Sequence, residues 1–172
     1  MKQRHIFDDD GHIENRSAFD TIFEVKAKEV GKYSSLKAQR LFDWWNSYTP
    51  DLPSYSEFDI SQHIKDADGY FLYNVISPTE YDIRLIGENA SSILGNKYAH
   101  TKIDTQTMAN DMHLYSLVSY LQRIINQSTA LSCHGTYIDT VGRKRKFQSV
   151  DCPMREACGE IKWIIGVIEE IK

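Results

Sequence analysis

The most constraining segment of this 172-residue sequence is IKWIIGVI, at residues 161–168. Successive side chains of a strand point to opposite faces, and apolar residues occupy both sets of positions in the middle of this segment. A strand with two apolar faces needs a covering layer on each side, which places it in the centre of a sheet. We expect residues 112–126 to form one cover and residues 17–48 to form the other.

Helical periodicity supports both covers. The N-terminal region predicts two helices, over residues 17–31 and 35–48, and prolines follow the second. Their apolar stripes contain Phe19, Ile22, Phe23 and Val30, and then Leu41, Trp44, Trp45 and Tyr48. The segment 112–126 carries a longer stripe at the same spacing, formed by Leu114, Leu117, Val118, Leu121, Ile124 and Ile125.

The remainder of the chain predicts strands joined by short turns. Runs rich in β-branched and aromatic residues predict five strands, over residues 70–76, 81–86, 130–140, 146–152 and 161–171. Short helices are predicted over 58–65 and 89–94, and a short helix or a loop over 101–110. The fold class is therefore α+β, with a polar lead-in at 1–15, a helical extension at 16–50 and a core at 51–172.

The charge balance limits the partners of this chain. Twenty basic and 24 acidic side chains give a net charge of −4, which argues against nucleic acid as a general partner, because such binding depends on neutralising phosphates. The N-terminus lacks a secretory signal and no apolar run has the length of a membrane helix. We therefore expect no membrane insertion and a cytoplasmic location, which also suits an odd number of cysteines.

Metal and catalytic sites find little support in the sequence. Four residues that could ligate zinc are Cys133, His134, Cys152 and Cys158. Adjacent residues of one strand point to opposite faces, so Cys133 and His134 cannot share a metal ion. We predict no metal and no enzyme activity. The alternative is a small α+β enzyme of cone-shaped fold, in which His113 and Asp111 would form the acid–base pair.

Three segments resemble the PAS domain family, and more narrowly the single-PAS-domain proteins common in alphaproteobacteria. The first is the tryptophan-bearing helix with LFDWW at residues 41–45, and the second is PSYSEFDI at 53–60. The third is YDIRLIGENASSILG at 81–95, which resembles the second strand of the family leading into its first core helix. The resemblance extends over about residues 36–171.

This resemblance implies a five-stranded antiparallel sheet with a cavity between its inner face and the core helices. The N-terminal helices are then expected on the other face, as the two apolar faces of the last strand require. It also implies sensing or partner binding without turnover. Our hypothesis is a non-catalytic sensory module that binds a small molecule, a signalling partner, or both. The alternative is a pure dimerisation or docking module with a filled core. No cysteine stands in the Cys-Arg-Phe-Leu setting of flavin-binding light sensors, so a photoactive flavin is not expected and the cofactor stays open.

The ligand site and the partner surfaces can be predicted by residue. Any ligand is expected between the helix at 112–126 and the inner sheet face, near Tyr73, Arg84, Met112, Tyr115, Tyr137 and Ser149. A homodimer is expected through Phe19, Ile22, Phe23, Trp44 and Trp45, with packing inside the domain as the alternative for the tryptophans. Deletion of residues 1–34 should then shift the chain towards monomer. The hairpin tip is either a solvated turn or a patch for an acidic partner, through Arg143, Lys144, Arg145 and Lys146.

Overall fold

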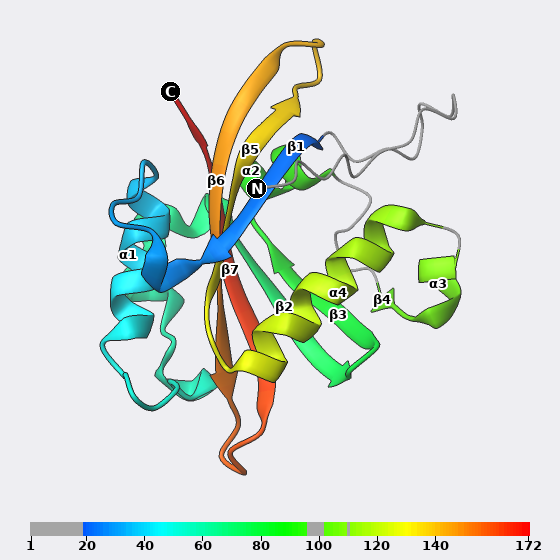
Figure 1. Cartoon of the computed structure of the whole chain (residues 1–172). Helices are drawn as coiled ribbons and strands as arrows, with labels where there is room; N and C mark the ends of the chain where they lie inside the picture. Colours follow the sequence, from blue (N-terminus) through cyan, green and yellow to red (C-terminus); the bar gives the residue numbers. More distant parts are fainter. Residues whose placement is uncertain (1–18, 96–101, 110) are drawn as a thin grey trace.

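A seven-stranded antiparallel sheet forms the centre of the protein, in the strand order β1-β5-β6-β7-β2-β3-β4. The computed structural model describes residues 19–95, 102–109 and 111–172 (Figure 1). The strands are β1 (Phe19–Lys26), β2 (Tyr70–Ser77), β3 (Glu80–Ile86), β4 (Lys102–Ile103), β5 (Leu131–Ile138), β6 (Lys144–Arg155) and β7 (Ile161–Ile171). The helices are α1 (Leu36–Asn46), α2 (Glu88–Leu94), α3 (Thr105–Ala109) and α4 (Met112–Gln127), and short 3-10 segments are η2 (Ala27–Glu29), η3 (Tyr55–Glu57) and η4 (Ile60–Gly69). The predicted lead-in at 1–15 lies outside the described residues.

Strand β7 lies in the middle of the sheet, as its two apolar faces predict. On one face, Ile164 and Ile168 join a core cluster with side chains of α2 and α4. On the other face, Ile165 and Val167 join a second cluster with side chains of α1. Figure 1 shows α1 on one side of the sheet and α4 on the other. The predicted α+β class is confirmed.

Hydrogen bonds fix α1 against its face of the sheet. The indole Nε1 of Trp45 donates to the carbonyl of Pro153 over 2.9 Å, and both groups are buried. The backbone N–H groups of Ser34 and Ser35 donate to Gln148 Oε1 over 2.8 and 2.9 Å, just before the helix begins. The helix predicted over 35–48 is therefore confirmed as a packed layer on the sheet.

The helix predicted over residues 17–31 is wrong, because residues 19–26 form strand β1. This strand pairs antiparallel with β5, with Phe19 opposite Tyr137 and Lys26 opposite Leu131. Phe19, Ile22 and Phe23 fit a helical stripe, yet the segment is also rich in the aromatic and β-branched residues that strands favour. Pairing with the otherwise open edge of β5 satisfies the backbone of both strands, and this long-range interaction decides between the two states.

The predicted five strands become seven in the structure. The five expected strands form the contiguous block β5-β6-β7-β2-β3, and β1 and β4 extend it at its two edges. The two-residue strand β4 and helix α3 lie in the 101–110 region, where a short helix or a loop was predicted. One N-terminal helix, α1, covers the second face in place of the expected pair.

Candidate functional site

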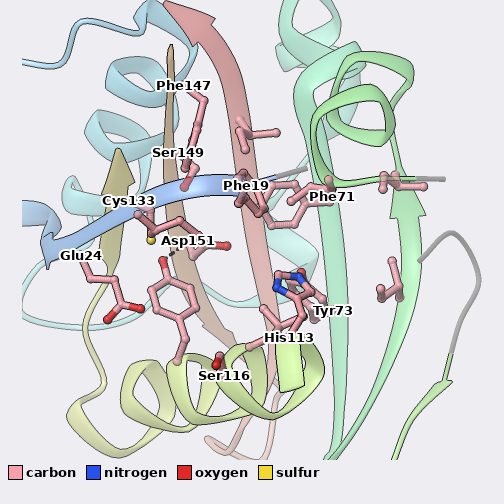
Figure 2. Close-up of a pocket in the computed structure, with 17 residues that line it drawn as sticks. Phe19, Glu24, Phe71, Tyr73, His113, Ser116, Cys133, Phe147, Ser149 and Asp151 are labelled. Carbon is pink, nitrogen blue, oxygen red and sulfur yellow. Dashed lines mark hydrogen bonds between the residues drawn. The ribbon is translucent and has the colours of Figure 1, made fainter. Parts of the chain in front are cut away.

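A half-open cavity of about 90 Å³ lies between α4 and the inner face of the sheet (Figure 2). A single water needs about 10–15 Å³ by this kind of measure, so the core beneath α4 is not filled by its own side chains. Most of the wall is apolar and comes from six strands and two helices. The apolar lining residues include Phe19, Ile22, Phe71, Ile83, Ile86, Leu94, Leu117, Phe147 and Ile168.

One side of the cavity carries polar groups from β1, β5, β6 and α4. Ser149 and Asp151 are two residues apart on β6 and therefore share a face of the sheet. Cys133 of β5 lies opposite Ser149 in the strand register. The hydroxyl of Tyr120, on α4, donates to Asp151 Oδ2 over 2.6 Å. Figure 2 shows Cys133, Ser149 and Asp151 together on this side, with Glu24 beside them.

A glycine on the neighbouring strand makes room for the Asp151 carboxyl group. Gly166 of β7 lies opposite Asp151 in the register. A Cβ atom at Gly166 would come within 2.2 Å of the Phe71 ring and 2.7 Å of Asp151 Oδ1. The missing side chain thus lets an aromatic ring and a carboxyl group occupy the same part of the core.

The electrostatic surroundings of this polar wall disfavour negative charge. The pKa of Asp151 is raised to about 7, chiefly by burial; the Tyr120 hydrogen bond opposes this shift and the nearby Glu24 carboxyl adds to it. Burial likewise raises the pKa of Tyr120 and of Cys133 well above their ordinary values. Tyr120 and Cys133 are therefore neutral at physiological pH, whereas Asp151 changes charge close to it.

The structure brings two of the six predicted ligand residues to the cavity. Tyr73 and Ser149 line it, whereas the side chain of Arg84 is 56% exposed and forms an ion pair with Asp82. Arg84 misses the cavity because its neighbour Ile83 faces inward, and adjacent strand residues alternate.

Of the other three predicted ligand residues, two lie outside the cavity and the side chain of the third is not described. Tyr115 lies on the solvent face of α4 and is 60% exposed. Tyr137 is buried, but outside this cavity, where its hydroxyl donates to Glu170 over 2.8 Å. The side chain of Met112 lies outside the described part of the chain.

Sequence reasoning missed Asp151, Tyr120 and Glu24 as cavity residues. Asp151 offered a signal in the sequence, because it interrupts a run of apolar residues between Val150 and Cys152 at the end of the strand predicted over 146–152. A charged residue in such a run is rare without a partner or a function. Glu24 could not be found in the same way, because its segment was expected to be helical.

The residues predicted for a dimer surface pack within the chain. Phe19 and Trp45 are buried, and Ile22 lines the cavity. Phe23 stacks on His134 with ring centroids 5.3 Å apart, and Trp44 packs edge-on against Phe58. These contacts account for the apolar character that suggested an exposed surface.

The basic hairpin is largely paired with carboxylates of the same chain. Arg143 and Arg145 both donate to Asp139, over 2.9 and 3.1 Å, and Lys144 forms an ion pair with Asp20 over 2.6 Å. Backbone N–H groups and these guanidinium groups lower the pKa of Asp139. Lys146 is exposed. Three of the four cations at this hairpin are thus paired with carboxylates of the same chain.

No group of three or more potential metal ligands occurs among the residues that the structure describes. Cys133 and Cys152 belong to the two core clusters on opposite faces of the sheet, and Cys158 is exposed. Within the same described ranges, no helix has the length and apolar character needed to cross a membrane.

Comparison with known proteins gives similarities in solved structures only. No protein-family model matches the chain, and no curated protein matches it. An RNA-binding light-oxygen-voltage receptor is similar at 10% sequence identity and a TM-score of 0.47, over 87% of this chain and 38% of the receptor chain. This chain thus spans well under half of that receptor. A fungal light-oxygen-voltage photoreceptor is similar at 11% identity and a TM-score of 0.44, over 83% of this chain and 96% of that one.

Proposed function

We propose that this chain is a non-catalytic sensory module of the PAS type, which binds a small molecule in the cavity beneath α4. The cavity is the observation that supports binding. It is mostly apolar and has a few converging polar groups on one side, as ligand pockets generally do. A ligand there contacts both α4 and the sheet, so its binding energy can bias how α4 packs and thereby report occupancy to a partner.

The two alternatives from the sequence are less well supported. A pure docking module with a filled core is at odds with the space beneath α4. An enzyme using His113 and Asp111 is at odds with the role of Asp111, whose Oδ1 accepts the backbone N–H of His113 over 2.9 Å as the N-cap of α4. A homodimer, a signalling partner and a cytoplasmic location stay predictions from the sequence.

Native mass spectrometry of the full chain purified from its own host tests the proposal. We expect a fraction of the protein to carry a bound small molecule. In Ser116→Leu, an isopropyl group replaces a hydroxyl on the cavity wall, and the bound fraction should fall at least about fivefold, because overlap with packed atoms is costly.

Ser119→Leu is the matched control, since Ser119 lies on the exposed face of the same helix. It should bind as the wild type does. Two results would contradict binding in this cavity. One is wild-type protein that carries no small molecule, and the other is an equal bound fraction in the two serine variants.

A further inference from the structure

The two carboxyl groups that line the cavity, those of Glu24 and Asp151, differ in their charged partners. Glu24 forms an ion pair with Arg123 at the edge of the cavity. Asp151 is only 3% exposed, and in the described part of the chain no lysine or arginine lies within ion-pair distance of it. Burying a carboxylate without a positive partner is costly, so such a group either takes up a proton or pairs with a cation.

The two oxygens of the Asp151 carboxyl group differ in their surroundings. Oδ2 accepts the hydroxyl of Tyr120 over 2.6 Å. Oδ1 lies beside Gly166 and Phe71, and among the described residues none donates a hydrogen bond to it. Because Asp151 lines the cavity, Oδ1 offers acceptor lone pairs to whatever enters.

We propose that the cavity selects small primary amines, which bind as ammonium ions against the Asp151 carboxylate. This inference rests on the ligand-binding role proposed above and specifies the ligand class. An ammonium group supplies the missing positive charge and three N–H donors. Oδ1 of Asp151 accepts one donor, and the hydroxyl oxygen of Ser149 lies on the same wall to accept another. The aromatic and aliphatic remainder of the wall suits an alkyl body.

The volume of the cavity sets the size of that body. An apolar protein cavity of about 150 Å³ accommodates benzene. The 90 Å³ found here is smaller, which favours an amine with about four carbons. Isobutylamine and isobutanol are suitable probes, because they have the same number of heavy atoms and differ in charge at neutral pH.

The first test compares these two probes on the full chain by NMR chemical-shift titration at pH 8. Isobutylamine should bind at least about tenfold more tightly than isobutanol, as expected for one charge-assisted hydrogen bond. Asp151→Asn should remove this preference while leaving the weaker binding of isobutanol. Asp82→Asn makes the same charge change on a partly exposed residue outside the cavity and should behave as the wild type.

A second test uses pH and needs no variant at Asp151. The titratable groups that face Asp151 are Tyr120 from α4, Cys133 from β5 and Glu24 from β1. Tyr120 and Cys133 stay neutral between pH 6 and pH 8, because burial raises the pKa of each. Protonation of Asp151 should weaken isobutylamine about tenfold from pH 8 to pH 6 and leave isobutanol unchanged. His113 also lines the cavity, and His113→Asn should keep this pH dependence.

The outcomes separate this inference from the proposed function. Equal affinities for the two probes, or a preference for isobutylamine that survives in Asp151→Asn, would overturn selection of amines. If neither probe binds while protein from the host carries a small molecule, amine selection fails and ligand sensing stands. If neither probe binds and the host protein is empty as well, both fail.

Discussion

At the scale of single residues, the core of this protein departs from an apolar interior at Asp151. Its neighbours Val150 and Cys152 are fully buried, and Gly166 on the adjacent strand provides the space for its carboxyl group. One hydrogen bond, from Tyr120, does not offset the cost of burying a charge, and the pKa of Asp151 rises to about 7 as a result. The residue that best defines the candidate site is therefore also one that weakens the fold at high pH.

This cost predicts a pH-dependent effect of Asp151→Asn on stability. The pKa of Asp151 in the folded protein lies above that of an aspartate in the unfolded chain. The unfolding free energy of the wild type is therefore highest, as far as this group is concerned, below about pH 4, and it falls as the pH rises to about 7. Asparagine does not titrate and can still accept the Tyr120 hydroxyl. From pH 4 to pH 8, the unfolding free energy of the variant relative to the wild type should increase by on the order of 4 kcal/mol. Urea denaturation across this range measures it, and a pH-independent difference would contradict the assignment.

At the scale of elements, α4 and β1 show two different sources of secondary structure. α4 has a complete apolar stripe and an N-cap, so its local sequence and its packing agree. β1 has no such agreement, because its apolar spacing suits a helix while its composition suits a strand. Its pairing with β5 includes a close approach at Gly135, where a Cβ atom would lie 1.9 Å from the carbonyl oxygen of Thr21. The neighbouring strand thus decides the conformation of β1.

The N-cap of α4 predicts a modest and specific loss of stability in Asp111→Ala. Asp111 Oδ1 accepts the backbone N–H groups of His113 and Leu114 over 2.9 and 3.4 Å. Removing this cap should lower the unfolding free energy by about 1 kcal/mol. Asp111→Asn retains an amide oxygen as acceptor and should cost only a few tenths of that value. Chemical denaturation compares the two, and equal losses would show that capping is not the cause.

At the scale of the whole molecule, the N-terminal segment completes the sheet. Strand β1 covers the edge of β5 and contributes Phe19 and Ile22 to the wall of the cavity. Helix α1 then covers the opposite face from the one that α4 covers. Residues 19–34 thus belong to the same folded unit as the strands that follow them.

This arrangement reverses the expected effect of deleting residues 1–34. The sequence alone predicted a shift towards monomer, whereas loss of β1 exposes the edge of β5 and removes buried Phe19. The deletion should lower the unfolding free energy by about 3 kcal/mol or more and promote association through the open edge. Thermal unfolding and sedimentation velocity measure the two effects. A truncated chain that stays monomeric with an unchanged unfolding midpoint would contradict this role of β1.

Local patterns in the sequence determined most of the elements and the central position of β7. Apolar side chains on both faces of 161–168 demand two covers, and the stripe of α4 supplies one of them, so these features follow from periodicity. The residues of the cavity could be predicted less well, because successive side chains of a strand point to opposite faces. The sequence analysis placed Arg84 in the cavity, whereas its neighbour Ile83 faces it. Tertiary structure alone decided that residues 19–26 form an edge strand and that Glu24, Tyr120 and Asp151 line one cavity. These residues lie up to 127 positions apart in the sequence (151 − 24), and no local pattern encodes which distant strand or helix a side chain will face.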